Sequence, residues 1–367
     1  MAPAEPLVCE RLCGDLRQPI TALVWSSDGE FLAIASAGGE LLLLDFRAGC
    51  EELLQGERDS SLDVVGFSDD GHFVMAAGQS GELLLWELGG TGVRPLAFDP
   101  MQLGGGWIDA AAWQPGGLLL AVAVGRTLRL WDGASRTWRE PPLELPGTIQ
   151  ALAWSSDGMQ LAASCHGELV QWRPAQGAQG DPPVRNAISS AGLALAFSAP
   201  GQHLACGMLD RSLLVWPAGF HGQPWQYSGF PAKVRQLAWS DQPGRLAPLL
   251  ASASAEALIL WTQVRQGSKA WQPEPLLWHE KRVNALAFAP GSTLLASASS
   301  DGTVGLWDGR GRLMQPIEGQ GSGFNVLAWR PDGRHLAAGD AQGRWWLWPV
   351  SVPARERQRS SSGSGFG

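Results

Sequence analysis

Histidine and cysteine are the residues of this 367-residue chain best suited to catalysis or metal binding, and they are few and dispersed. The six histidines form no H-E-x-x-H pair of the zinc-protease kind, and no serine stands in the G-x-S-x-G elbow of a hydrolase. The chain has 47 glycines, yet none belongs to a phosphate-binding G-x-x-x-x-G-K-S/T loop. We therefore predict no catalytic residue and no cofactor, in a protein that is not an enzyme.

The five cysteines leave a metal site open as an alternative. Cys9 and Cys13 are spaced C-x3-C and could bind zinc together with Cys50 or a histidine, and Cys165-His166 is a second thiol–imidazole pair. Positions i and i+4 of one strand lie about 13 Å apart, which is too far for a single ion. The sequence favours buried thiols in a reducing compartment and no metal ligand. A zinc-linked accessory protein remains the alternative.

Aspartate followed by glycine recurs at positions that could be mistaken for calcium loops. Each place carries only one or two carboxylates and lacks the spacing of an EF-hand. Aspartate readily caps its own turn, and glycine adopts the positive φ angle that many tight turns need. We therefore predict turns between strands at Asp28, Asp70, Asp157 and Asp332.

A repeated pattern of strands positions these residues. Each repeat has an apolar run ending in an aromatic, a turn rich in Pro, Asp and Gly, and two further apolar runs. In the seventh repeat the expected strands are Val283–Phe288, Thr293–Ser299 and Thr303–Asp308, followed by a weaker outer strand. The repeats recur every 41 to 49 residues, as marked by the aromatics that end the first strands: Trp25, Phe67, Trp113, Trp154, Phe197, Trp239, Phe288 and Trp329. Units of this length bury their apolar faces by stacking on their neighbours.

The pattern resembles the WD-repeat family over about residues 7–349, and Trp-Asp pairs close two repeats, at Trp131-Asp132 and Trp307-Asp308. The resemblance implies an all-β β-propeller of four-stranded antiparallel blades that binds proteins or peptides. It also implies a buried hydrogen-bond network within a blade. Other repeats lack the histidine of that network, so we expect their blades to depend more on packing. The matching residues in the seventh repeat are His279, Ser297, Asp301 and Trp307.

Counting the repeats predicts an eight-bladed ring, with seven blades as the alternative because the first repeat is irregular. The eighth repeat is followed by Pro349 and Pro353, which leave no suitable outer strand. We expect the N-terminal stretch Leu7–Leu12 to supply that strand and close the ring. Residues 1–350 then form a single domain, and residues 351–367, rich in Arg, Ser and Gly, form a disordered tail.

Each first strand should begin at one mouth of the central channel, where a partner could bind. The residues four places before the first-strand aromatics form what we call the mouth ring: Thr21, Asp63, Asp109, Gln150, Leu193, Arg235, Asn284 and Asn325. Positions two places earlier add Trp107, Lys233 and Arg282. Acidic and aromatic residues thus gather on one side and basic residues on the other, which would orient a mixed-charge partner. The predicted partner-binding residues are Asp63, Trp107, Asp109, Gln150, Lys233, Arg235, Arg282, Asn284 and Asn325.

Composition limits the classes of partner. A net charge of -8 argues against nucleic acid, and no apolar run approaches the roughly 18 residues of a membrane span. The first residues lack the basic and apolar regions of an export signal, so we expect a cytoplasmic protein. The excess of Arg over Lys, with abundant Ala and Gly, suggests a bacterial source. We predict a non-catalytic scaffold for a protein or peptide, a monomer that assembles into a larger complex; a propeller enzyme is the less favoured alternative.

Overall fold

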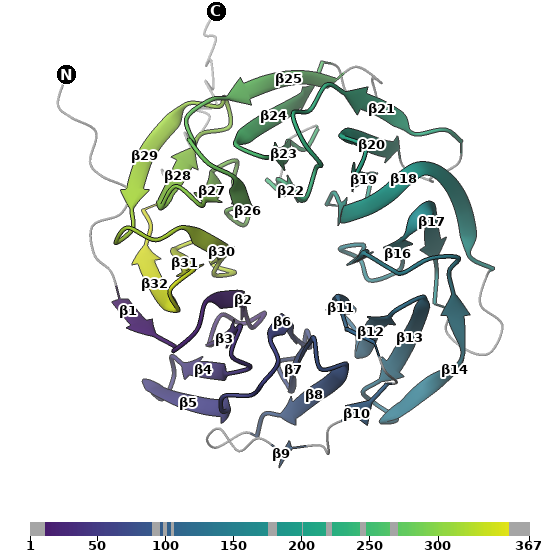
Figure 1. The fold of residues 1–367 in the computed structure, drawn as a ribbon, viewed down its shortest axis with the longest axis vertical. Helices are drawn as coiled ribbons and strands as arrows, with labels where there is room; N and C mark the ends of the chain where they lie inside the picture. Colours follow the sequence, from purple (N-terminus) through teal and green to yellow (C-terminus); the bar gives the residue numbers. More distant parts are fainter. Residues whose placement is uncertain are drawn as a thin grey trace, which may run out of the picture.

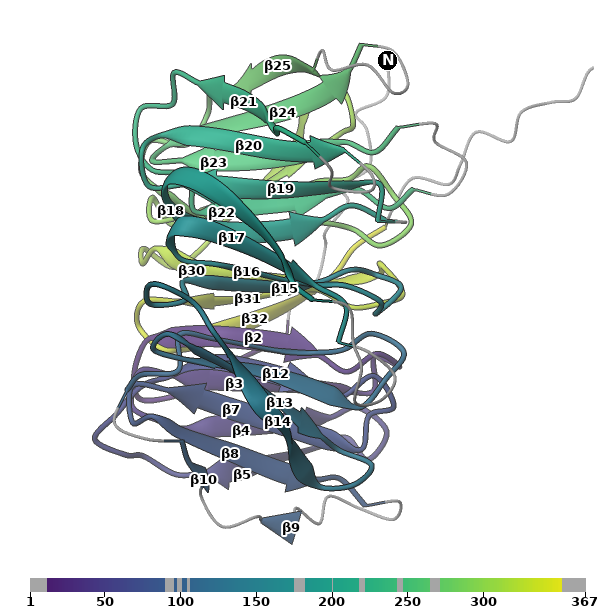
Figure 2. The same cartoon turned by 90° about the vertical axis from the view of Figure 1, so that its right-hand side faces the viewer.

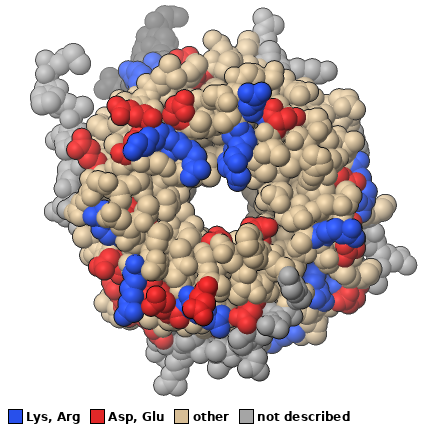
Figure 3. All heavy atoms as spheres, in the orientation of Figure 1, with Lys and Arg blue, Asp and Glu red and all other residues tan. Residues whose placement is uncertain are grey.

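The computed structural model describes residues 12–89, 96–97, 101–103, 106–174, 182–199, 201–217, 222–242, 247–264 and 271–351. These residues form strands and turns, without a helix, arranged as a ring (Figure 1). Seen edge-on, the strands run between the two faces of the ring (Figure 2). The space-filling view shows a channel through its centre (Figure 3). Cys9, the tail after Ser351, and all of the predicted closing strand except Leu12 lie outside the described residues.

The repeating unit is an antiparallel sheet whose first strand lies at the channel and whose last strand lies at the outer rim (Figure 1). The first three units comprise β2 (Ile20–Trp25), β3 (Phe31–Ser36), β4 (Leu41–Asp45) and β5 (Cys50–Gln55); β6 (Leu62–Phe67), β7 (Phe73–Gly78) and β8 (Glu82–Glu87), with β9 (Leu96–Ala97) and β10 (Met101–Gln102) both paired to β8; and β11 (Ala110–Trp113), β12 (Leu119–Val124), β13 (Thr127–Asp132) and β14 (Thr137–Glu144).

The remaining units follow in chain order around the ring. They comprise β15 (Ala151–Trp154), β16 (Leu161–Ser164), β17 (His166–Trp172) and β18 (Val184–Phe197); β19 (His203–Met208), β20 (Ser212–Pro217) and β21 (Trp225–Ser228); β22 (Gln236–Trp239), β23 (Leu250–Ser254), β24 (Ala257–Gln263) and β25 (Trp271–Leu276); β26 (Val283–Phe288), β27 (Leu295–Ser299), β28 (Thr303–Trp307) and β29 (Leu313–Glu318); and β30 (Phe324–Trp329), β31 (His335–Asp340) and β32 (Arg344–Pro349) with β1 (Leu12–Asp15).

One strand serves two units. The described strands form seven hydrogen-bonded sheets, because a seven-stranded sheet contains two successive units. The first part of β18 pairs with β17 as an outer strand, and its last part pairs with β19 as a first strand. When β18 is divided in this way, the pattern of sheets recurs eight times around the ring within the described residues.

The hydrophobic core is divided between neighbouring sheets. Middle strands such as β4 and β27 are buried along their whole length, because a sheet covers each of their faces. In β27, LASAS, one leucine is followed by alternating alanine and serine, and these small residues let the sheets approach closely. In the described part of the chain, eight hydrophobic clusters each combine side chains from two consecutive units.

Trp25 Nε1 and Trp113 Nε1 are buried without a partner among the described residues, but the other three tryptophans that end first strands join consecutive sheets by a hydrogen bond as well as by packing. In each case the indole Nε1–H donates to the backbone carbonyl of the residue before the preceding unit's aromatic. A phenylalanine at the same place would bury its ring but could not make this bond. The pairs are Trp154 with Ala112 at 3.0 Å, Trp239 with Ala196 at 2.9 Å, and Trp329 with Ala287 at 3.1 Å.

The N-terminal strand closes the ring by pairing with the last repeat. Strand β1 runs antiparallel to β32, with Leu12 opposite Leu347 and Asp15 opposite Arg344. The N–H of the following residue, Leu16, continues this contact by donating to Gly343 O at 2.8 Å. The strand therefore extends to Asp15, beyond the predicted end at Leu12, because the edge of β32 remains available along its full length.

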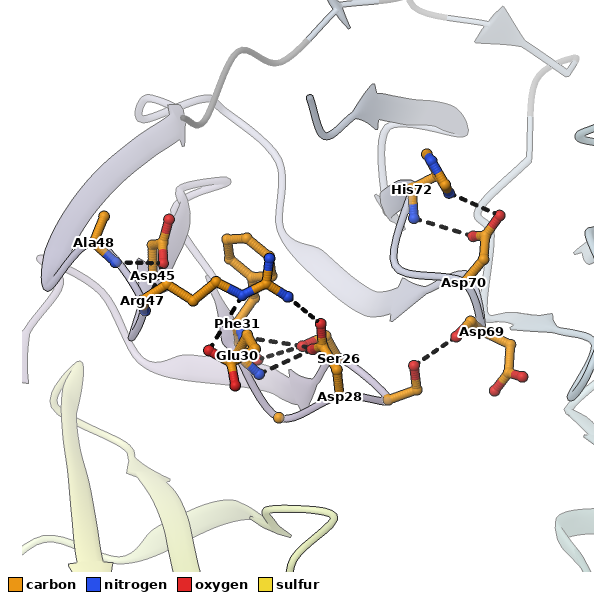
Figure 4. Close-up of polar contacts among 12 residues, drawn as sticks. Ser26, Asp28, Glu30, Phe31, Asp45, Arg47, Ala48, Asp69, Asp70 and His72 are labelled. Atoms are coloured by element: carbon orange, nitrogen blue, oxygen red, sulfur yellow. Dashed lines mark hydrogen bonds and ion pairs between the residues drawn. The ribbon is translucent and has the colours of Figure 1, made fainter. Parts of the chain in front are cut away.

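The Asp-Gly pairs form turns on the face opposite the channel mouth. Asp28 Oδ1 accepts hydrogen bonds from Ser26 Oγ at 2.6 Å and from the Glu30 N–H at 2.9 Å. Asp70 is bound in the same way by Ser68 Oγ at 2.6 Å and the His72 N–H at 3.0 Å (Figure 4). These bonds hold the pKa of both carboxyls below the usual range, although burial opposes them. These carboxylates therefore stabilise the turns in which they lie.

Neighbouring turns on this face are also bonded to each other. Ser27 Oγ donates to Asp69 O at 2.5 Å (Figure 4). Asp69 Oδ2 in turn accepts a hydrogen bond from the Gly116 N–H at 3.0 Å. Arg330 Nε donates to Gly29 O at 2.9 Å and so joins the last repeat to the first. These bonds tie consecutive units together along the opposite face.

The four residues matched to the WD-repeat network are linked in one buried chain. Trp307 Nε1–H donates to Ser297 Oγ at 2.8 Å, and Ser297 Oγ lies 2.8 Å from His279 Nε2. His279 Nδ1 lies 3.0 Å from Asp301 Oδ2. Because indole nitrogen can only donate, the serine hydroxyl is directed to the histidine and the Nδ1–H to the carboxylate. This hydrogen-bond network joins the β25–β26 connection to β27 and β28.

His203 occupies an unusual place for a titratable residue, inside a group of three tryptophans. Its ring centroid lies 5.9 Å from that of Trp225, 5.7 Å from that of Trp239 and 5.5 Å from that of Trp271. The side chain is buried, and its Nδ1 has no hydrogen-bond partner among the described residues. The imidazole therefore packs as a flat apolar ring, and burial lowers its pKa below the ordinary 6.5.

Acid is expected to weaken the fold through His203. In the unfolded chain the imidazole binds a proton near pH 6.5, whereas the folded protein binds it only at lower pH. The free energy of unfolding is therefore highest above that value and falls on acidification, by up to about 1.4 kcal/mol for each pH unit. Urea unfolding at about pH 7.5 and about pH 5.5 should show a smaller acid loss for His203→Phe than for the unaltered protein. Equal losses would contradict this origin, since the other histidines are common to both proteins.

Candidate functional site

Irregularities in the first strands position the mouth ring. The strand register slips by one residue at five of its positions, Thr21, Asp63, Leu193, Asn284 and Asn325, each of which lies between two paired residues. Such a bulge turns the extra side chain away from the regular alternation of the sheet. Asp109, Gln150 and Arg235 instead stand immediately before β11, β15 and β22.

Three members of the mouth ring bind the next unit along the chain. Asn284 Nδ2 donates to Phe324 O at 2.8 Å, and Asn325 Nδ2 donates to Ile20 O at 3.1 Å. Thr21 Oγ1 donates to Leu62 O. In each pair the accepting carbonyl belongs to the residue just before the next mouth-ring position. The predicted partner-binding residues Asn284 and Asn325 therefore hold consecutive units together at the channel.

Asp63 and Asp109 cannot make this bond while they are ionised, because a carboxylate has no hydrogen to donate. Asp63 instead accepts a hydrogen bond from Ser61 Oγ, and both aspartates are exposed. Partial burial raises the pKa of the Asp109 carboxyl, and the neighbouring charge of Asp63 raises it further. The acidic side of the mouth thus holds two carboxylates close enough to repel each other.

The channel mouth contains a cavity of about 500 Å³ that brings six of the nine predicted residues together. Its lining includes Asp63, Lys233, Arg235, Arg282, Asn284 and Asn325. Figure 3 shows the charges on opposite rims: Lys and Arg lie over the β22 and β26 side of the channel, and Asp and Glu lie beside β6 and β11. The arrangement can attract an anionic group to one rim and a cationic group to the other.

Trp107, Asp109 and Gln150 lie outside the lining of this cavity. Trp107 is 60% exposed, while the next residue, Ile108, is buried and its N–H donates to Gly78 O at 3.0 Å. The indole is therefore held on the mouth face by an anchored backbone, with its ring in solvent. Asp109 and Gln150 are exposed at the starts of their units. These residues would contact only a partner that extends past the cavity.

The described residues do not gather a metal site, since no three His, Cys, Asp or Glu side chains among them are placed to hold an ion. Cys13 and Cys50 are exposed, and Cys165 and Cys206 are buried. Burial raises the pKa of Cys206 well above its ordinary value, so this thiol stays protonated. No helix within the described part of the chain has the length and apolar character needed to cross a membrane.

Comparison with known proteins identifies the repeat. The family model described as "WD domain, G-beta repeat" matches residues 274–308, the segment that contains the His279–Ser297–Asp301–Trp307 network. THO complex subunit 3 of Arabidopsis thaliana is 32% identical over 117 residues, covering 31% of this chain and 36% of that protein. WD repeat-containing protein 1 of Rattus norvegicus is 22% identical over 202 residues, covering 42% and 33% respectively. The matches thus span about a third of the length of these relatives, which are eukaryotic.

Solved structures match over nearly the whole ring. Sqt1 of Chaetomium thermophilum, bound to the N-terminus of the ribosomal protein L10, has a TM-score of 0.76 at 18% identity, covering 91% of this chain and 97% of that one. The computationally designed Ika8 protein has a TM-score of 0.69 at 20% identity, covering 92% and 98%. The repeated strand pattern, the family-model match and the sequence relatives thus support a WD-repeat family for this chain, and the solved structures share its β-propeller fold.

Proposed function

We propose that this protein is a non-catalytic scaffold that binds a segment of a protein partner at the channel mouth. The observation that carries the proposal is the cavity of about 500 Å³, lined by three cations on one rim and by Asp63 on the other. Charged groups on opposite rims fix the direction of a bound segment, and the exposed Trp107 adds an aromatic anchor beyond the cavity. A monomer that joins a larger complex fits this arrangement.

The relatives support a role in protein interaction. One solved structure of a similar propeller contains the N-terminus of a ribosomal protein, and one sequence relative is named as a subunit of the THO complex. Neither the enzyme alternative nor the zinc-linked alternative gains a supporting observation among the described residues. We therefore propose that the propeller ring is the support and that its charged mouth binds the partner.

Affinity capture from a lysate of the source organism tests the proposal. The variant Trp107→Ala/Asp109→Ala/Arg235→Ala alters three exposed side chains on the mouth face, so its melting temperature should match that of the unaltered protein. Arg310→Ala, an exposed cation in the β28–β29 turn on the opposite face, is the matched control. We expect proteins retained by the unaltered protein and by Arg310→Ala to be lost from the triple variant. Equal capture by all three would place binding elsewhere on the molecule.

A further inference from the structure

Basic residues on one side of the mouth face lack acidic partners. Among the described residues, no ion pair is formed by five exposed cations of the fifth to seventh units: Arg211, Lys233, Arg235, Lys281 and Arg282. Across the mouth, by contrast, Arg58 pairs with Glu82 at 2.8 Å and Arg17 with Glu57 at 3.1 Å. Among the described residues of the mouth face, the cations without an ion pair therefore lie on one rim, although the protein has a net charge of -8.

The backbone and neighbouring side chains hold three of these cations toward the cavity. Arg282 Nε donates to Asn284 Oδ1 at 2.8 Å, and the amide of Asn284 is itself fixed by Ser300 Oγ and Phe324 O, both at 2.8 Å. The two Nη atoms of Arg282 keep their donors for another group, since no partner for them lies among the described residues. A guanidinium fixed through Nε presents the fork that fits a carboxylate.

Lys233 and Arg235 flank a buried anchor. Val234 between them is fully buried, and its N–H donates to Met208 O at 3.1 Å. The neighbours on either side are exposed and both line the cavity. Three cations from two consecutive units therefore line one cavity, and Asp63, the acidic residue of that lining, lies on the opposite rim.

We infer that this rim is a carboxylate-binding pocket, which takes an aspartate, a glutamate or a terminal carboxylate from a segment of the partner protein. The inference rests on the proposed function and names the group that is recognised. A polyanion such as a nucleic acid fits poorly, because Asp63 lines the same cavity and Asp109 stands beside it. A segment that carries one acidic group and, a few residues away, a basic group satisfies both rims.

Selection from a random peptide library tests the inference directly. The library is exposed to the unaltered protein, to Lys233→Glu/Arg235→Glu and to the control Arg310→Glu, after matched melting temperatures have been established. We expect acidic residues to be enriched among peptides bound by the unaltered protein and by the control, and basic residues to replace them with the double variant. Peptides without acidic enrichment, or the same peptides for all three proteins, would overturn the inference.

Titration of one selected peptide completes the test. Replacing its acidic residue with the neutral amide should weaken binding to the unaltered protein by about tenfold or more, and should have little effect on binding to the double variant. Displacement of the peptide by an equal concentration of inorganic phosphate or of a single-stranded oligonucleotide would show a general anion site and overturn the peptide assignment. If the selected peptides contain no acidic residue but fail to bind Trp107→Ala/Asp109→Ala/Arg235→Ala, the carboxylate inference is refuted and the proposed function stands. If the selected peptides bind that variant as tightly as they bind the unaltered protein, the proposed function itself is refuted.

Discussion

Removing residues 1–15 is expected to make the ring unstable and prone to aggregation. The deletion takes away β1 and exposes the hydrogen-bonding edge of β32, whose sequence RWWLWP contains three buried tryptophans. An unpaired apolar edge both weakens the last unit and offers a template for pairing with other chains. Thermal unfolding combined with light scattering measures both effects, and we expect a melting temperature lower by well over ten degrees or no cooperative transition.

Two further variants distinguish the effect of breaking the β1–β32 pairing from the effect of shortening the polypeptide. Deleting residues 1–11 leaves β1 in place and should preserve the melting temperature. Gly14→Val keeps the whole chain, but a Cβ at this position would stand 2.5 Å from the indole of Trp345, so the strand must move away from β32. We expect it to reproduce part of the destabilisation. A deletion of residues 1–15 that melts like the intact protein would contradict closure by β1.

Ser297→Ala is expected to destabilise the protein by about 2–4 kcal/mol, more than a typical loss of one hydrogen bond. Ser297 Oγ lies between Trp307 Nε1 and His279 Nε2, both in the buried network. Removing the hydroxyl leaves the indole N–H and an imidazole nitrogen without their partner in a region closed to water. Urea unfolding at neutral pH gives the change in the free energy of unfolding.

The sixth unit supplies a matched control for this prediction. There Ser252 Oγ accepts a hydrogen bond from Trp261 Nε1 at 2.9 Å, at the equivalent place in the sheet but without the histidine and aspartate. Ser252→Ala should therefore cost about 1 kcal/mol, the usual value for one hydrogen bond. Equal effects of the two serine substitutions would show that the histidine and Asp301 add nothing to the seventh unit.

The inner strands could be predicted because their signals are local. The expected strand Val283–Phe288 coincides with β26, and Thr303–Asp308 differs from β28 by one residue, since a glycine-containing turn follows each apolar run. The outer strands were harder to predict. Strand β14 contains Arg, Glu and Pro, because a strand with one solvent face tolerates them, so no continuous apolar run marks where it begins.

Sequence located the mouth ring but could not divide its members by role. Asn284 and Asn325 bind the next unit through amide hydrogens, and Asp63 has no such hydrogen to give. The presence or absence of a side-chain donor was a signal available in the sequence. Whether a carbonyl of the next unit lies within reach depends on how the sheets stack, and only the structure provides that.

The hydrogen bonds of the mouth ring fix the separation between the basic rim and the acidic rim. From Arg282 an unbroken path runs through Asn284 to Phe324, through Asn325 to Ile20, and through Thr21 to Leu62, the neighbour of Asp63. The path crosses the junction between the first and last units, so the basic and acidic rims are parts of one rigid frame. If partner segments bind as proposed, this frame would select them by the number of residues that separate their acidic and basic side chains, as well as by the charges themselves.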